Sequence, residues 1–161
     1  MNNFKSAVIL LVEDDVADQK LIKKSFNSSK IANEIRFCNG AEEALEYLGK
    51  SKTDNADFPI PDLILLDLNM PGMSGKEFLS VLKQDEQLDT IPVVVLTTSD
   101  SDRDVLDSFK LQASGYVKKP VELEEFCQVI KDLSDYWFVI CKRVDRNRDL
   151  KNASNTCVIS G

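Results

Sequence analysis

The sequence predicts an α/β fold: a doubly wound, five-stranded parallel sheet in the order 2-1-3-4-5, with an extended C-terminal helix. Three short runs of Val, Ile and Leu without polar alternation are typical of parallel strands that helices cover on both faces, at Ala7–Val12, Leu63–Leu66 and Val93–Leu96. Segments of helical period separate these runs. Because strand and helix patterns alternate along the chain, a parallel sheet is expected.

The first half of the chain supplies two helices and one further strand. A helix is expected over Val16–Phe26, where apolar side chains recur on one stripe, and a second over Ala41–Leu48, after an Asn-Gly turn. Ile35–Cys38 alternates apolar with polar or small residues, which is typical of a strand with one exposed face. The polar stretch 49–61 is expected to be a long connection.

The second half continues the same alternation. A third helix is expected over Lys76–Leu82, and Tyr116–Lys118 has the mixed pattern of an edge strand. The two mixed strands are placed at the edges and the three apolar strands in the middle, which gives the order 2-1-3-4-5. In such a sheet, ligands bind beyond the carboxyl ends of the strands. Functional residues are therefore sought at the strand ends.

Composition narrows the class of protein. The chain has 161 residues, of which 43% are hydrophobic, enough for one domain core. Its 20 basic and 27 acidic residues give a net charge of −7, which disfavours nucleic acid as a partner. The four cysteines show no CxxC spacing and there is no histidine, so a zinc site or a disulfide scaffold is not expected. No apolar run is long enough to span a membrane and no signal peptide is evident, so we expect a cytoplasmic protein with no membrane association.

Every predicted strand ends in polar residues. Glu13-Asp14-Asp15 follow the first strand and Asp67 follows the third, and these strands are neighbours in the predicted order, about 4.8 Å apart. Carboxylates at that spacing repel one another unless a cation lies between them. Hard oxygen ligands in this number suit Mg²⁺, so a magnesium site is expected at this edge of the sheet.

Two more strand ends complete a site for phosphoryl chemistry. Thr97 follows the fourth strand and Lys119 follows the fifth. The carboxylate of Asp67 is suited to attack phosphorus in line, while a metal ion and an ammonium group neutralise the phosphoryl oxygens and a hydroxyl donates to one of them. The set therefore predicts a phosphoryl receptor.

This combination resembles the receiver domain of bacterial two-component response regulators, which has a flavodoxin-like fold. The resemblance rests on the acidic cluster after the first strand, the segment D-x-N-M-P-G-M-S-G that begins at Asp67, the threonine at 97 and the Lys-Pro pair at 119, and it covers about residues 5–133. It implies that Asp67 is the phosphoacceptor. It also implies that Glu13, Asp14 and Asp67, with the backbone carbonyl of Asn69, bind Mg²⁺.

The resemblance assigns further roles around the phosphoryl group. Thr97 and Lys119 would contact it, and Thr97 and Tyr116 would form the switch pair. The Lys119-Pro120 bond would be cis, a form that X-Pro bonds adopt at low cost. Asp15 lies one position beyond the acidic pair, where it is expected to cap the first helix.

The resemblance also implies a function. The chain would be a single-domain response regulator that accepts a phosphoryl group on Asp67 from a sensor histidine kinase in a two-component phosphorelay. It would then switch conformation and partner binding. It would not be an enzyme beyond catalysing its own Mg²⁺-dependent phosphorylation and dephosphorylation. Its extended last helix and the insertion before the third strand are similar to small regulators paired with phytochrome-type histidine kinases. The residues do not identify the kinase, its signal, the downstream target or the lifetime of the phosphorylated state.

Other interpretations remain open at this level. Each polar strand end taken alone is compatible with a helix cap, a turn or a solvated surface charge. Haloacid-dehalogenase-like phosphatases also use an Asp nucleophile with Mg²⁺, but they require a second Asp two residues later, where this chain has Asn69. A receiver-like binding module that works without phosphorylation is a third class, although such modules commonly lack an acid or the lysine.

The last forty residues suggest a dimer. A heptad pattern runs through a helix expected over Glu122–Arg146, so the receiver with its extended last helix would occupy residues 1–146. The stretch from 136 to 140 is apolar all round the helix, which suggests a homodimer contact by Tyr136, Trp137, Phe138 and Ile140. The polar tail, residues 147–161, is expected to be disordered.

Overall fold

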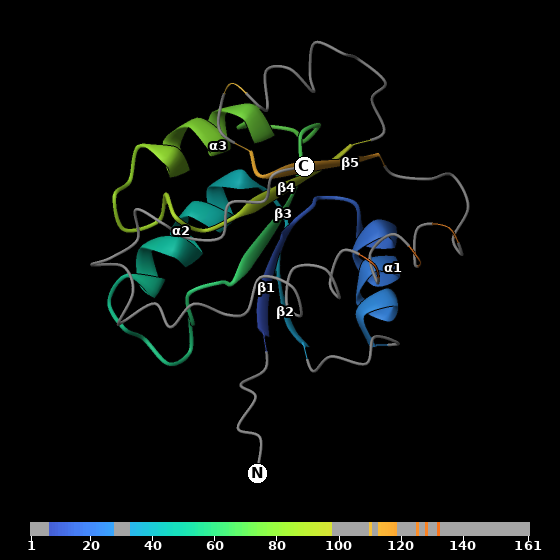
Figure 1. Ribbon diagram of the computed structural model, residues 1–161, viewed down its shortest axis with the longest axis horizontal. Helices are drawn as coiled ribbons and strands as arrows, with labels where there is room; N and C mark the ends of the chain where they lie inside the picture. Colours follow the sequence, from blue (N-terminus) through green and yellow to red (C-terminus); the bar gives the residue numbers. More distant parts are fainter. Residues whose placement is uncertain are drawn as a thin grey trace.

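The computed structural model describes residues 7–27, 33–97 and 113–118, together with Lys110, Glu125, Gln128 and Asp132. Strands and helices alternate within these ranges (Figure 1). The elements are β1 (Ala7–Val12), α1 (Val16–Asn27), β2 (Asn33–Cys38), α2 (Ala41–Ser51), β3 (Leu63–Asp67), α3 (Gly75–Lys83), β4 (Val93–Thr97) and β5 (Gly115–Lys118). The seven predicted elements up to β4 are confirmed. β5 lies where the fifth strand was predicted, and the predicted extended C-terminal helix lies outside the described residues.

The sheet is parallel and its central order is as predicted. β1 pairs with β2 on one side and with β3 on the other, and β3 pairs with β4. This confirms the order β2-β1-β3-β4. The backbone of β5 continues the sheet beside β4, where Thr97 lies opposite Lys118.

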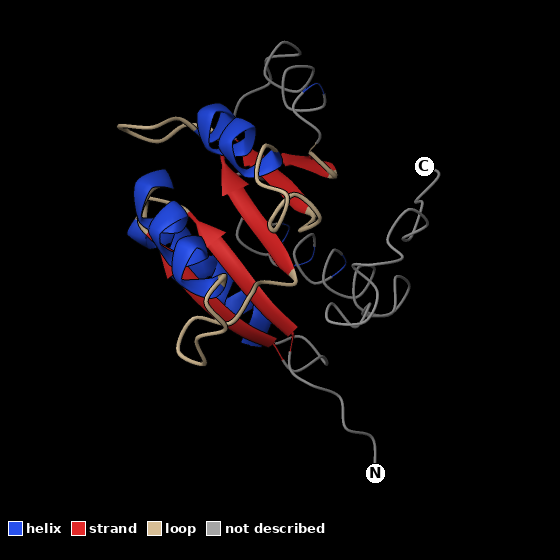
Figure 2. Ribbon diagram, turned by 90° about the vertical axis from the view of Figure 1, so that its left-hand side faces the viewer, coloured by secondary structure: helices blue, strands red, loops and turns tan. Residues whose placement is uncertain are grey.

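Each face of the sheet has its own apolar core, because successive side chains of a strand point to opposite faces. Figure 1 shows α1 on one side of the sheet and α2 and α3 on the other, and Figure 2 views the molecule from the side of α2 and α3. On the α1 side, Ile22 is fully buried against side chains of β1, β3 and β4. On the other side, Leu48 of α2 and Phe78 of α3 pack on the alternate residues of the same strands. β3 is buried along its whole length.

The predicted end of the second helix was wrong. The chain stays helical through Ser51, so the first three residues of the expected connection 49–61 belong to α2. The added turn carries two polar contacts: the Ser51 hydroxyl donates to the Tyr47 carbonyl at 3.1 Å, and Lys50 pairs with Glu46 one turn earlier. The connection to β3 follows, and Asp54 within it has a positive φ of 55°.

None of the helices in the described ranges is long and apolar enough to cross a membrane.

Candidate functional site

The carboxyl ends of β1 and β3 bring three acidic side chains together. Val12 is the register partner of Leu66, so Glu13, which follows β1, and Asp67, the last residue of β3, are neighbours. Carboxylate oxygens of Glu13, Asp14 and Asp67 all lie within 4.8 Å of one another. Glu13 is only 1% exposed and Asp67 only 7%, while Asp14 is more accessible. The predicted acidic cluster is therefore present in the structure.

The residue after this cluster has the role expected for it. Asp15 precedes the first residue of α1, and its Oδ1 accepts a hydrogen bond from the Asp18 backbone N–H at 3.1 Å. Such a side chain satisfies one of the backbone donors that a helix start leaves without a partner. Asp15 therefore caps α1, and the acids available to a cation are the two that precede it and Asp67.

Asp67 is held by the backbone that follows it. Its Oδ1 accepts a hydrogen bond from the Asn69 N–H at 3.1 Å, and the Gly75 N–H donates to the Leu68 carbonyl at 3.2 Å. A Cβ on Gly75 would lie 2.5 Å from the Asp67 carbonyl oxygen and 2.7 Å from the Leu68 Cα. Only glycine lets the start of α3 approach β3 this closely.

The start of α3 has its own cap. Ser74 precedes the helix in an extended conformation, and its hydroxyl accepts a hydrogen bond from the Glu77 N–H at 3.2 Å. This cap fixes where the helix begins. Together with Gly75, it determines the course of the backbone immediately after Asp67.

The donor set fits a hard divalent cation. Three carboxylates that converge from two neighbouring strands repel one another, and a cation bound among them removes that repulsion. Mg²⁺ favours a few carboxylates completed by water and phosphate oxygens, whereas the softer thiolate and imidazole ligands are absent from the cluster. The cluster is therefore chemically suited to Mg²⁺ or a similar ion.

The sequence does not predict the role of Gln19, whose side chain links two loops at this site by hydrogen bonds. The Gln19 side-chain amide on α1 donates to the Glu13 carbonyl at 2.6 Å and to Asn39 Oδ1 at 2.8 Å. It thereby ties the loop after β1 to the loop after β2. Nothing in the local sequence marks Gln19, because its partners come from distant parts of the chain.

A family comparison agrees with this geometry. The model of the response regulator receiver domain matches residues 9–131. The chain belongs to this family. It is a receiver of two-component signalling and not a conventional enzyme, and this membership sets the haloacid-dehalogenase-like interpretation aside.

Individual relatives support the same assignment. The response regulator Rcp1 of Synechocystis sp. is 37% identical over 130 residues, which are 81% of this chain and 88% of that protein. The crystal structure of the phosphorylated cyanobacterial phytochrome response regulator RcpA superposes with a TM-score of 0.77 at 36% identity, covering 84% of this chain and 96% of that one. The Mn²⁺-bound form of Rcp1 gives a TM-score of 0.74 at 37% identity, covering 81% and 94%.

The other predicted residues of this receiver are described to different extents. Asn69 is exposed and follows Asp67 in the loop before α3. Thr97 ends β4 and Tyr116 lies in β5, but for both residues the description is limited to the backbone. Lys119, its bond to Pro120 and the predicted dimer residues, Tyr136, Trp137, Phe138 and Ile140, lie outside the described residues.

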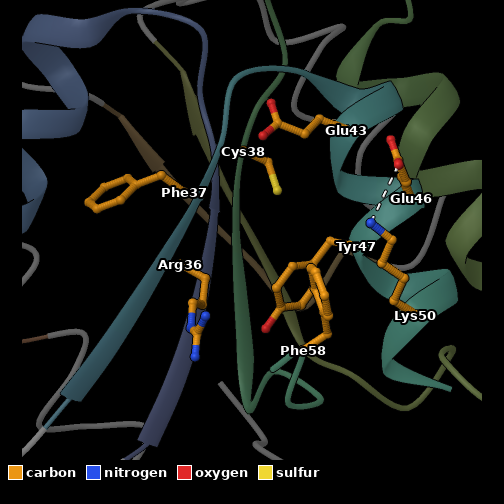
Figure 3. A pocket seen from close by; sticks show the side chains of 8 residues that line it. All are labelled: Arg36, Phe37, Cys38, Glu43, Glu46, Tyr47, Lys50 and Phe58. Atoms are coloured by element: carbon orange, nitrogen blue, oxygen red, sulfur yellow. Dashed lines mark ion pairs between the residues drawn. The ribbon is translucent and has the colours of Figure 1, made fainter. Parts of the chain in front are cut away.

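A separate pocket of about 320 Å³ opens between β2, α2 and the connection to β3 (Figure 3). Tyr47 and Phe58 form its aromatic wall with ring centroids 5.4 Å apart, and the Tyr47 hydroxyl donates to the Pro59 carbonyl at 2.7 Å. Lys50 lies 4.7 Å from the Phe58 ring centroid and pairs with Glu46. Burial raises the pKa of Tyr47 to about 12. None of the acidic-cluster residues lines this pocket.

Proposed function

We propose that this receiver accepts a phosphoryl group on Asp67 from the phosphohistidine of a sensor histidine kinase. The observation that carries the proposal is the position of Asp67. A carboxylate that is 7% exposed lies at the end of a fully buried strand, within 4.8 Å of two more carboxylates. Burying charge in this way is costly for a structural role alone, and it is explained by a cation and an anionic substrate.

The transfer is a displacement at phosphorus. An oxygen of the Asp67 carboxylate attacks in line, the new O–P bond forms an acyl phosphate, the P–N bond of the donor breaks, and the imidazole leaves. The Asn69 N–H already donates to Asp67 Oδ1, which fixes the orientation of the carboxylate. Positioning and charge neutralisation are the main sources of catalysis in such reactions.

The proposed metal ligands are Glu13, Asp14, Asp67 and the backbone carbonyl of Asn69. Mg²⁺ is the proposed ion because the carboxylates form a hard oxygen donor set. When bound, the ion would neutralise charge on the phosphoryl oxygens. That a relative was solved in a Mn²⁺-bound form supports a divalent cation in this family.

The switch is proposed to use residues at the ends of β4 and β5. Thr97 and Lys119 would contact the phosphoryl group, and their inward movement would let Tyr116 favour a buried rotamer. The backbone supports this placement, because Thr97 lies at the carboxyl end of β4 opposite Lys118. The change would be a population shift between two states of one fold.

The proposed partner is a sensor histidine kinase, and a phytochrome-type kinase is the candidate. The receiver itself is proposed to be cytoplasmic. Support comes from the similarity to RcpA, which was solved as a phytochrome response regulator. Purified phytochrome-type and unrelated kinases, each autophosphorylated, should be compared as donors. Faster transfer from the phytochrome-type kinase is expected, and equal slow transfer from all of them would remove this part of the proposal.

A homodimer through an extended last helix is also proposed. The receiver would then span residues 1–146, with residues 147–161 as a disordered tail. Replacing Trp137 and Phe138 with polar residues should give a folded monomer by light scattering, and a monomeric wild type would contradict the dimer. Elution with and without beryllofluoride tests whether phosphorylation changes the assembly.

The proposed function is tested by intact-protein mass spectrometry. The chain is incubated with Mg²⁺ and phosphoramidate, beside an Asp67→Asn control. One added phosphoryl group is expected, and it should be absent from the control and absent when EDTA replaces Mg²⁺. No addition under any condition would contradict the proposal and favour a receiver that acts without phosphorylation.

A further inference from the structure

The first turn of α2 is linked by hydrogen bonds to both loops that carry the acidic cluster. The helix begins at Ala41, and its first turn contains two adjacent acids, Glu42 and Glu43. Neither belongs to the cluster of Glu13, Asp14 and Asp67. Each of the two carboxylates accepts a hydrogen bond from the backbone of a different loop.

Glu42 holds the loop between β3 and α3. Its Oε1 accepts a hydrogen bond from the Met73 backbone N–H at 2.8 Å. Gly72 has a φ of +77°, and a Cβ there would lie 2.8 Å from the same oxygen. Glycine thus provides both the backbone conformation and the space for this contact. The Met73 hydrogen bond also lowers the pKa of Glu42, so the carboxylate remains charged near neutral pH.

Glu43 holds the opposite side of the site through a chain of hydrogen bonds. Its Oε2 accepts from the Asn39 N–H at 2.8 Å, and Asn39 Oδ1 accepts from the Gln19 side chain at 2.8 Å. The same Gln19 amide donates to the Glu13 carbonyl at 2.6 Å. Figure 3 shows the Glu43 side chain at the start of α2, close to the end of β2. The start of α2 is therefore connected to both loops of the acidic cluster.

We propose that Glu42 is a positioning residue, which fixes the β3–α3 loop against α2 so that the Asn69 backbone is preformed for a divalent cation. The inference rests on the proposed function, because Asn69 is a proposed ligand. Met73 lies in the same short loop as Asn69, between Asp67 at the end of β3 and Gly75 at the start of α3. Met73 lies next to the Ser74 cap, so Glu42 restrains the part of the loop that leads into α3, four residues after Asn69. A ligand loop that is already ordered loses less entropy when the cation binds.

Three variants of the full chain separate this role from a general charge effect. Glu42→Ala removes the acceptor, Glu42→Gln keeps an oxygen acceptor without the charge, and Glu46→Ala removes an equal charge one turn further along the same helix. Glu46 is a matched control because it pairs with Lys50 on the pocket side of α2 and not with the loop (Figure 3).

Two measurements are made on each variant. Hydrogen exchange at the Met73 amide, without metal, reports the contact itself. NMR titration with MgCl₂ gives the dissociation constant. Glu42→Ala is expected to accelerate Met73 exchange and to weaken Mg²⁺ binding by about threefold. This is below the roughly tenfold minimum for groups bonded directly to a metal ligand, because Glu42 acts on Asn69 only through the loop. Glu42→Gln should recover most of both losses, and Glu46→Ala should match the wild type.

The outcomes distinguish this inference from the proposed function. If the wild type binds Mg²⁺ and takes up a phosphoryl group, but Glu42→Ala behaves like Glu46→Ala, the positioning role is refuted and the proposed function stands. If the wild type binds no Mg²⁺, both are overturned. Thermal unfolding shows whether each variant is folded. If Glu42→Ala does not fold, the comparison of Glu42→Gln with the wild type and Glu46→Ala replaces it.

Discussion

Replacing Gly75 with alanine is expected to destabilise the protein, although alanine is the better helix former. The added Cβ would meet two backbone atoms, the Asp67 carbonyl oxygen at 2.5 Å and the Leu68 Cα at 2.7 Å. Overpacking of this kind costs about 1–3 kcal/mol, and contacts with backbone belong to the upper part of that range. Alanine returns up to about 1 kcal/mol through helix propensity. The free energy of unfolding should therefore fall by about 2 kcal/mol.

Gly49 offers a matched control within α2. A Cβ at Gly49 meets nothing within 4 Å, so Gly49→Ala adds helix propensity without overpacking. It should raise the free energy of unfolding by about 0.5–1 kcal/mol. The same chemical change is thus expected to have opposite signs at the two positions.

Urea unfolding followed by circular dichroism measures both effects. The Gly75→Ala midpoint should fall with an unchanged slope, and the melting temperature should drop by about 4–8 °C in a chain of this size. A Gly75→Ala variant as stable as the wild type would refute the claim that α3 must begin in contact with the backbone of β3.

Three further predictions concern other charged or buried groups. Asp67→Asn should raise the free energy of unfolding in metal-free buffer by about 1–3 kcal/mol, because it relieves repulsion among the clustered carboxylates. Mg²⁺ at ten times its dissociation constant should stabilise the wild type by about 1.4 kcal/mol. The same Mg²⁺ concentration should stabilise the Asp67→Asn variant by less. Unchanged melting in both experiments would contradict the cation site. Burial, with a smaller effect from Glu43, raises the pKa of the Cys38 thiol to about 12, so only about one thiol in 10⁴ is ionised at pH 8. Peptide mapping after iodoacetamide treatment should find Cys38 unmodified in the native protein and alkylated after unfolding, and rapid native labelling would argue against its burial. Tyr47→Phe removes the hydrogen bond to the Pro59 carbonyl and should cost about 1 kcal/mol in urea unfolding, whereas no loss would mean that the bond contributes nothing net.

The elements that the sequence predicts best are those whose pattern depends on burial alone. The first strand has the predicted bounds, Ala7–Val12, because helices cover it on both faces and its residues are uniformly apolar. The end of α2 was predicted too early, because Gly49–Ser51 are small or polar and their helical state depends on contacts with the preceding turn.

The residues of the candidate site likewise fall into those that the sequence predicts and those that it does not. Glu13, Asp14 and Asp67 were predicted together because strand order alone brings their strand ends together. The cap at Asp15 was predicted from its place before the helix and is confirmed. Gln19 and Glu42 were not predicted, because their roles depend on contacts between separate loops, such as the one that joins Glu42 to Met73 across 31 positions. The roles of Thr97, Lys119 and Tyr116 stay predictions.

The central claim is that Asp67 itself carries the phosphoryl group, and direct mapping tests it. The protein is treated with phosphoramidate and Mg²⁺, reduced with borohydride to convert the acyl phosphate to a homoserine residue, digested and sequenced by tandem mass spectrometry. The predicted result is homoserine at position 67. Glu13 and Asp14 should remain carboxylates, with neither reduced to its alcohol. Reduction at another carboxylate, or no reduced residue in a protein that binds Mg²⁺, would contradict it.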